Sequence, residues 1–158
     1  MIVITHLRED YRASGIAARL ALYYMDLVEV IPKDYRRKWV NVKGQLEEAD
    51  AVIFIMVDED ADFDKGTSKE LNLIVQKQKP LYIVVPEKIA NRFKNWKNLR
   101  NVKIFTFNPD DPRDIMGVVG KIVEEEKNKK KNDIVDAIII TGLLMLFALI
   151  LASSPSKK

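Results

Sequence analysis

The sequence predicts an α/β fold in which helices cover both faces of a five-stranded parallel sheet. Three observations lead to this prediction. Five short runs rich in β-branched and aromatic residues recur, and segments with apolar residues at helical spacing separate them. The third run, 51–57, is apolar throughout, which is typical of a strand buried on both faces. The expected strands are 2–5, 27–31, 51–57, 81–85 and 102–107.

Helices are expected between the strands because apolar residues recur there three or four positions apart, as at Ile16 and Leu20 or Leu71 and Ile74. Strands that alternate with helices form βαβ units and a parallel sheet. The length suits a flavodoxin-like (Rossmann-like) three-layer sandwich with strand order 2-1-3-4-5. The expected helices are 14–25, 67–78, 88–95 and 111–126.

A ligand site in such a sheet is expected at the carboxyl ends of the strands, where the strand order reverses. For the order 2-1-3-4-5, that point lies between the first and third strands. The segment that follows Thr5 and the segment 58–70 should therefore face each other across a crevice.

The composition excludes several classes of site. The 158 residues include no cysteine, which rules out a disulfide framework, Cys-ligated zinc and a thiol nucleophile. A single histidine, His6, rules out multi-histidine metal sites. The net charge is +3, but residues 127–158 hold six lysines and two aspartates, a balance of +4, which leaves −1 for residues 1–126. A near-neutral body lacks the basic surface that nucleic acids require, so no nucleic-acid partner is expected.

The segment 134–152 predicts a transmembrane helix. It reads IVDAIIITGLLMLFALILA, 19 residues with a single charge at Asp136. At about 1.5 Å per residue it would be roughly 28 Å long, close to the hydrocarbon core of about 30 Å. A buried core helix, the alternative, usually keeps a polar stripe. The expected organisation is a domain at 1–126, a basic linker at 127–133, the span at 134–152 and a short tail at 153–158.

The charges that flank this span predict its orientation. Four lysines precede the span, at 127 and 129–131, and two follow it. The positive-inside bias then keeps the domain 1–126 in the cytoplasm. The first apolar run ends at Thr5 and is too short for a signal peptide. We therefore expect a tail-anchored, single-pass membrane protein whose N-terminal domain is cytoplasmic.

Acidic residues alternate after the third strand, at Asp58, Asp60, Asp62 and Asp64. A calcium-binding EF-hand loop needs Gly at its sixth position and Glu at its twelfth. A loop that starts at Asp60 has lysine and leucine at these positions. A solvated acidic loop is the simpler interpretation, and we expect neither a metal ion nor a cofactor.

The segment 64–71, which reads DKGTSKEL, has two interpretations. Thr67 and Glu70 fit a capping box, in which the two side chains satisfy backbone donors at a helix start. Alternatively, Glu70 lies in the first turn of a helix at the expected ligand-binding edge, where the helix N-terminus favours the ionised form. An ionised glutamate can attack an anomeric carbon or stabilise the charge that develops there. Asp64 would then orient the sugar or assist departure of the base.

The runs 48–55, 64–71 and 78–85 resemble the nucleoside 2-deoxyribosyltransferase family. They read EADAVIFI, DKGTSKEL and QKPLYIVV. The resemblance implies that Glu70 is the nucleophile that breaks an N-glycosidic bond and that Asp64, six residues earlier, helps to form the site. The opening run 3–10, VITHLRED, is similar to the start of TIR domains, whose catalytic members cleave NAD with a helix-borne glutamate. TIR NAD hydrolases commonly carry tryptophan where this chain has Gly66.

Further candidates for substrate binding surround this motif. Gly66 and Thr67 lie within it, and Asp58 lies ahead of it. His6 and Arg8 follow the first strand, where they can contact a phosphate or a base.

The loop 32–45 carries Arg36, Arg37 and Trp39. These residues can steer an anionic nucleotide and stack on its base. They can equally bind a protein partner, which is how TIR domains use the loop in this position.

Two functions stay open. The first is a membrane-anchored enzyme that cleaves, or transfers at, the N-glycosidic bond of a nucleoside or nucleotide of the NAD or deoxynucleoside class, with Glu70 as nucleophile. The second is a non-catalytic, TIR-like signalling module that binds a nucleotide and self-associates at the membrane, where anchoring raises its effective concentration. Both predict a nucleoside or dinucleotide ligand, the membrane as a partner through 134–152, and a homo-oligomer.

Overall fold

The computed structural model describes the backbone of residues 1–34 and 37–153, and the side chains of residues 1–34, 37–111 and 113–133. The chain divides into two compact units, Met1–Val123 and Glu124–Lys158. The first unit holds the whole sheet and all of the candidate site residues.

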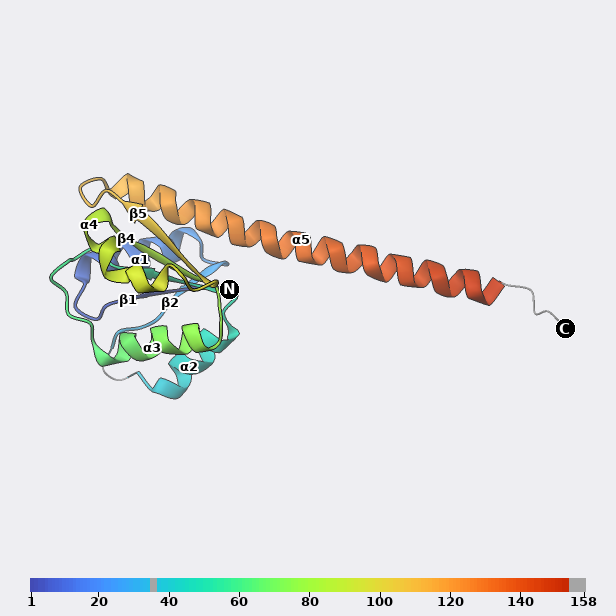
Figure 1. The fold of residues 1–158 in the computed structure, drawn as a ribbon, viewed down its shortest axis with the longest axis horizontal. Helices are drawn as coiled ribbons and strands as arrows, with labels where there is room; N and C mark the ends of the chain where they lie inside the picture. The colour runs from blue at the N-terminus through green and yellow to red at the C-terminus, as the bar shows by residue number, and fades with distance from the viewer. Residues whose placement is uncertain (35–36, 154–158) are drawn as a thin grey trace. The chain divides into compact units, whose positions relative to one another are not determined.

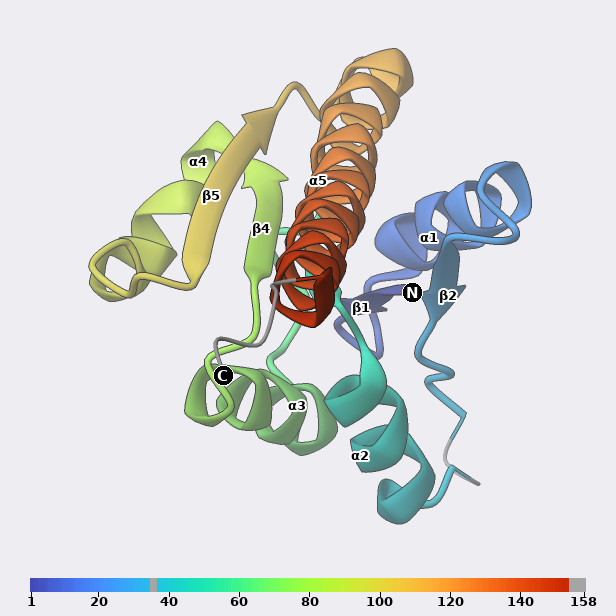
Figure 2. The ribbon, with the colours of Figure 1, turned by 90° about the vertical axis from the view of Figure 1, so that its right-hand side faces the viewer.

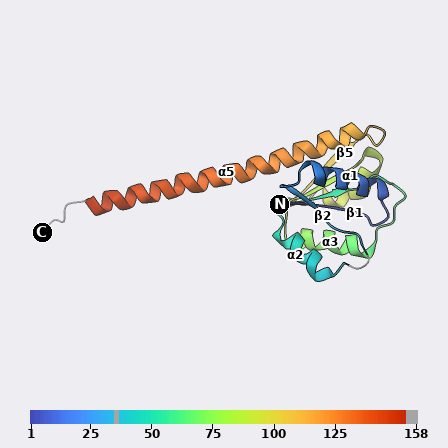
Figure 3. The same cartoon turned by 180° about the vertical axis from the view of Figure 1, so that it is seen from behind.

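Five parallel strands form the sheet: β1 (Ile2–His6), β2 (Val28–Val30), β3 (Ala51–Ile55), β4 (Leu81–Pro86) and β5 (Val102–Phe107). Their order is β2-β1-β3-β4-β5, which confirms the predicted class and strand order. Figure 1 and Figure 3 show the strands from opposite sides, with α2 and α3 below them. β1 lies inside the sheet, because Ile2 pairs with Val28 on one side and with Ala51 on the other.

Helices cover both faces of the sheet, and strand residues alternate between the two resulting cores. α1 (Tyr11–Tyr23) and the first turns of α5 (Pro112–Ser153) pack against strand residues such as Ile53. α2 (Trp39–Glu48) and α3 (Lys65–Gln76) pack on the opposite face against residues such as Phe54. Figure 2 shows α1 on one side of the strands and α2 and α3 on the other. β3 is accordingly buried along its entire length, as its apolar sequence predicts.

Asp10 connects α1 to the end of β3. Its carboxylate is fully buried and caps α1 by accepting a 3.0 Å hydrogen bond from the Ala13 backbone N–H. The second oxygen accepts the backbone N–H groups of Val57 and Asp58, over 2.7 and 3.1 Å. Three backbone donors therefore depend on one side chain, which fixes the β1–α1 connection beside the chain that leaves β3.

The helix α2 differs from the sequence prediction. Residues 32–45 are expected as a loop from the sequence, but α2 begins at Trp39. Only Val42 and Leu46 are buried on this helix. Two apolar positions four residues apart are too few to stand out as a helical period in a polar segment. The expected loop was therefore wrong for the second half of this segment.

Side-chain caps explain where α1 and α3 begin. α1 starts three residues before the expected position because Asp10 caps it, and α3 starts at Lys65 because Asp64 caps it. The helix predicted at 88–95 is divided in the structure into a short helix, α4 (Glu87–Ala90), and a 3₁₀ helix, η1 (Asn91–Trp96). Trp96 packs edge-on against Phe93 there.

The helix α5 contains the residues that were predicted as linker and span. Its backbone is helical from Pro112 to Ser153, so the polar segment 127–133 belongs to a helix. Within the part of the chain whose side chains are described, no helix has both the length and the apolar character to cross a membrane. The predicted span, 134–152, lies outside that part, and membrane insertion stays a prediction.

Candidate functional site

Glu70 is the centre of a buried ion cluster. Its side chain projects from α3, is fully buried, and is bonded at both carboxylate oxygens. Thr5 donates to Oε2 over 2.6 Å. Lys33 Nζ lies 2.8 Å from Oε2 and 3.2 Å from Oε1, and the Arg37 guanidinium pairs with Oε1. Two cations therefore face one carboxylate that solvent does not reach.

Three segments of the chain bring these residues together at the carboxyl end of the sheet. Thr5 stands near the end of β1, Lys33 and Arg37 lie in the connection between β2 and α2, and Glu70 lies on α3. Strand alternation points Thr5 toward the face that α2 and α3 cover, as it does Val3. The cluster thus sits where the strand order reverses, which is the position that the topology predicts.

Lys33 holds the cluster together. Its ammonium also lies 2.8 Å from Thr5 Oγ1 and 3.0 Å from Thr67 Oγ1. Burial lowers the pKa of Lys33 from its usual value, and the neighbouring Glu70 carboxylate partly offsets this effect. An ammonium with three N–H donors has an oxygen acceptor for each of them, which compensates for its loss of hydration.

Asp64 caps α3 and stays ionised. It accepts backbone N–H groups from Arg8 and Thr67, each over 2.9 Å, and the Thr67 hydroxyl lies 2.9 and 3.0 Å from its two oxygens. Partial burial raises the pKa of Asp64, but these hydrogen bonds outweigh it and hold the pKa below its usual value of 3.8. A carboxyl group with a lowered pKa is a poor proton donor near neutral pH, which opposes an acid role in departure of the base.

The capping box predicted from Thr67 and Glu70 is wrong. Asp64 is the N-cap, and Thr67 supplies the backbone N–H that this cap accepts. An aspartate placed three residues before Thr67 supplies a charged acceptor for the helix start. Glu70 consequently lies in the second turn of α3 rather than the first, and its charge is balanced by Lys33 and Arg37 rather than by the helix terminus.

A small hollow of about 290 Å³ opens beside this cluster. The Arg8 backbone reaches Asp64 across it, so the segments after β1 and β3 do face each other as predicted. Gly66 contributes backbone at its edge, where an added Cβ would overlap the Arg37 guanidinium. Its lining residues are Arg8, Lys33, Asp34, Arg37, Asp64, Lys65 and Gly66.

His6 does not join this cluster. It is 3% exposed, and strand alternation points it away from the face that Thr5 occupies. Its ring lines a separate hollow with residues of α1. Burial lowers the pKa of His6 below 6.5, whereas the Nδ1–H bond to the Leu7 carbonyl, 2.8 Å long, raises it. The geometry therefore gives no support to the predicted contact between His6 and a substrate bound beside Glu70.

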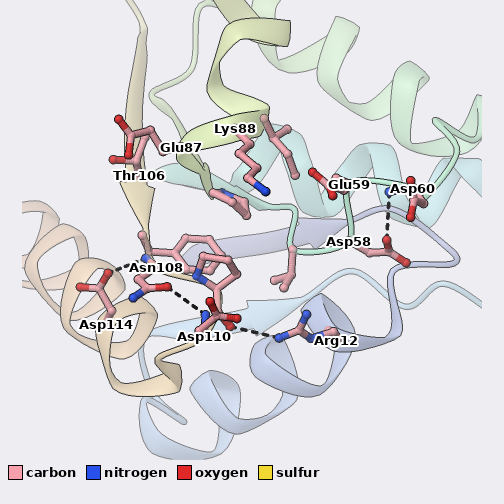
Figure 4. Close-up of a pocket in the computed structure, with 15 residues that line it drawn as sticks. Arg12, Asp58, Glu59, Asp60, Glu87, Lys88, Thr106, Asn108, Asp110 and Asp114 are labelled. Carbon is pink, nitrogen blue, oxygen red and sulfur yellow. Dashed lines mark hydrogen bonds between the residues drawn. The ribbon is translucent and has the colours of Figure 1, made fainter.

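Asp58 also lies apart from Glu70. It lines a different cavity, of about 820 Å³, at the carboxyl ends of β3, β4 and β5 (Figure 4). Asp58 accepts the Asp60 backbone N–H over 2.9 Å in a local turn. This cavity is larger than the hollow at Glu70 but holds no comparable buried ion pair. Among the described residues, no three histidine or acidic side chains are grouped to hold a metal ion.

Thr5 and Lys33 were not predicted as site residues. Thr5 ends the first expected strand with its side chain on the same face as Val3, so period-two alternation was the available signal. Lys33 follows the second strand, which is the neighbour of the first in the predicted order. Neither residue belongs to a recognisable sequence motif. Only the folded structure, which brings both of them next to Glu70, identifies them as site residues.

The candidate residues of the segment 32–45 do not all belong to this cluster. Arg37 joins the cluster, whereas Arg36 lies outside the described residues. Trp39 opens α2 and packs against the core, with the Lys69 ammonium 4.4 Å from its ring centre. The Lys69 ammonium occupies one face of this ring, and the stacking of Trp39 on a base stays a prediction.

Comparison with known proteins identifies a structural neighbour. No family model matches the chain, and no curated protein matches it. The structure of the Clostridium botulinum CMP N-glycosidase BcmB superposes with a TM-score of 0.56 at 12% sequence identity. The match covers 76% of this chain and 98% of that one. The two chains share a fold. At this identity the likeness extends to the fold, and any shared chemistry rests on the residues of the site.

Proposed function

We propose that this chain cleaves, or transfers at, the N-glycosidic bond of a nucleotide or nucleoside, with Glu70 as the nucleophile. The observation that carries the proposal is the buried Glu70 carboxylate at the point where the strand order reverses, next to a hollow bordered by cationic side chains. The structural neighbour, a CMP N-glycosidase, supports the same class of reaction on a shared fold.

The proposed first step breaks one bond and forms another. A Glu70 carboxylate oxygen bonds to the anomeric carbon as the C1′–N bond breaks, and the electron pair of that bond leaves with the base, which takes a proton from solvent. In hydrolysis, water then attacks the anomeric carbon, loses a proton to solvent and releases Glu70. In transfer, a nitrogen of a second base takes the place of water.

Asp64 has a positioning role in this proposal. Its lowered pKa keeps it an acceptor, and a carboxylate beside the sugar can accept hydrogen bonds from ribose hydroxyl groups. Thr67 and the Arg8 backbone hold Asp64 in place. This assignment replaces assistance to the leaving base, the other role expected from the sequence.

The test is release of free base. Full-length protein in mild detergent is incubated with nucleosides, their 5′-monophosphates and NAD, and products are separated by chromatography. We expect base release that Glu70→Gln abolishes and that Asp62→Asn leaves unchanged, since Asp62 is an exposed acid in the same connection. No release from any substrate would contradict the proposal.

A second measurement does not depend on how well Glu70→Gln folds. Wild-type protein is quenched in acid during turnover and digested, and its peptides are weighed. We expect a glycosyl adduct on the peptide that contains Glu70. An adduct confined to another acidic peptide would reject Glu70 as the nucleophile.

The second candidate function is a non-catalytic nucleotide-binding module that self-associates. One observation favours it: Glu70 is 0% exposed and both of its oxygens are engaged, as in a structural ion pair. This function predicts that the chain binds a nucleotide without consuming it and that its mass in solution rises with concentration. Light scattering and base release on the same sample separate the two functions.

We also propose that the segment 134–152 anchors the chain in a membrane, with the unit Met1–Val123 in the cytoplasm. The support is its apolar sequence of 19 residues and the lysines that precede it. Anchoring would confine either function to the membrane surface.

A further inference from the structure

The cluster around Glu70 presents a chemical problem for a nucleophile. One oxygen of Glu70 contacts Thr5 and Lys33, and the other contacts Lys33 and Arg37. The carboxylate is 0% exposed. A nucleophilic oxygen must present a lone pair to the anomeric carbon within about 3–3.5 Å. At least one of these partners must therefore move before a sugar can approach.

Arg37 is the most exposed of the three partners of Glu70. Thr5 is fixed in the middle of the sheet by the pairing of β1 with β3. Lys33 is 7% exposed and is held by Thr5 and Thr67 as well as by Glu70. The Arg37 side chain is 17% exposed, and the one other hydrogen bond it makes to the described side chains and backbone of residues 1–34 and 37–133 is a 3.5 Å contact with the Pro32 carbonyl. Arg37 can therefore leave Glu70 with little change elsewhere.

The hollow beside Arg37 is suited to an anion. Four cationic side chains border it, those of Arg8, Lys33, Arg37 and Lys65, against two acidic ones. One of the acids, Asp64, already accepts hydrogen bonds from Arg8 and Thr67. The hollow has a volume of about 290 Å³, which accommodates a phosphate group. A phosphate dianion also binds a guanidinium through two parallel hydrogen bonds, and it carries more charge than a carboxylate.

We propose that Arg37 is an exchangeable latch, which pairs with Glu70 in the free protein and moves to the phosphate of an incoming nucleotide. This inference rests on the proposed function. When Arg37 changes partner, Oε1 of Glu70 is released toward the sugar while Lys33 stays in contact with the carboxylate. The phosphate then has two effects: it binds the nucleotide to the site, and it removes Arg37 from the nucleophile Glu70. The site consequently selects 5′-phosphorylated nucleotides over free nucleosides.

Gly66 makes the latched state possible. A Cβ added at this position would overlap a guanidinium nitrogen of Arg37 and lie 3.3 Å from Asp64 Oδ2. The guanidinium is the end of a flexible side chain, so it is the group that would shift. Gly66→Ala therefore displaces the latch without removing its charge.

The experiment compares one nucleoside with its own 5′-monophosphate in full-length protein. For Arg37→Met we expect kcat/KM for the monophosphate to fall by about 10- to 100-fold, the effect of losing a charge-assisted hydrogen bond. The value for the nucleoside should stay level or rise, because the latch is absent. Gly66→Ala should raise turnover of the nucleoside relative to that of the monophosphate. Lys38→Met, an exposed neighbour, is the matched control and should change neither by more than about twofold.

Two results would overturn the latch. The first is an equal loss for both substrates in Arg37→Met, which would make Arg37 a general structural or electrostatic support. The second comes from calorimetry, which reads binding without turnover: if wild type and Arg37→Met bind the monophosphate equally well, Arg37 does not bind phosphate. If wild type binds the monophosphate through Arg37 yet releases no base, the phosphate exchange stands and the proposed function fails.

Discussion

At the scale of single residues, the charge of Glu70 dominates the site. A buried carboxylate between two cations contributes little net stability when complete, but it leaves an uncompensated buried charge when one partner is removed. The ion cluster therefore links stability to function, because any substitution within it affects both.

This linkage predicts a specific pattern in double variants. Glu70→Gln should destabilise the fold by about 3–5 kcal/mol, because it leaves the Lys33 ammonium buried without its counter-charge. Adding Lys33→Met should recover a large part of that loss, since the methionine has a similar length and no charge. Urea denaturation of the two single variants and the double variant measures the coupling. Additive losses would contradict a coupled pair.

Asp64 predicts a dependence on pH. Its pKa is lowered in the folded protein, so the unfolded chain binds more protons in the acid range. The stability that Asp64 contributes is therefore fully present above its unfolded value near 3.8 and is lost as the pH falls through the lower folded value. Thr67→Ala removes the hydroxyl and should raise the pKa of Asp64 toward 3.8, whereas Thr67→Ser should keep it low. Carbon-detected NMR titration measures the pKa of the Asp64 carboxyl group in both variants. Equal pKa values in Thr67→Ala and Thr67→Ser would show that the hydroxyl does not lower the pKa of Asp64.

At the scale of secondary-structure elements, Asp10 is the side chain on which the β1–α1 connection depends. Asp10→Asn should destabilise the fold by about 1–3 kcal/mol, because an amide has one acceptor oxygen for three backbone N–H groups. Asp26→Asn makes the same change at an exposed position and should stay within about 0.5 kcal/mol of wild type. Thermal unfolding checks both, and equal shifts would remove Asp10 from this role.

The elements also show what sequence patterns can predict. The strands and their order follow from five apolar runs, and β3 is recognisable because both of its faces are covered. α2 escapes prediction because only Val42 and Leu46 are buried on it. The residue at which a helix starts depends on which of several neighbouring side chains caps it. In α3 the cap is Asp64 rather than Thr67. The path of the backbone decides which side chain becomes the cap.

At the scale of the whole molecule, the location of the site was predictable and its composition was not. The strand order alone places a crevice between β1 and β3; Asp64 borders it, and Glu70 is buried beside it. Lys33 and Thr5 join them from segments 37 and 65 residues away along the chain, a convergence that no local pattern records. His6 lies on the opposite face of β1 from Thr5, because one position along a strand decides which face a side chain occupies.

The two units predict how truncation affects the chain. The last buried residues of α5 in the first unit are Ile122 and Val123, so a chain that ends at Glu126 keeps the sheet and its core. We expect it to unfold cooperatively and to stay in the supernatant when vesicles are sedimented. The full chain should sediment with the vesicles if 134–152 inserts into the bilayer. Full chain that remains in the supernatant would contradict membrane anchoring.

The interior position of β1 has a consequence for synthesis of the protein. β1 leaves the ribosome before its neighbours, yet it needs a partner on both edges. Ile2 can pair with Val28 early, but its pairing with Ala51 requires the third strand to be made. During that interval one edge of an apolar strand is open, and such edges recruit other chains. A nascent chain of this topology therefore exposes an unpaired strand edge until β3 emerges, and a ribosome stalled before Ala51 would hold an aggregation-prone intermediate.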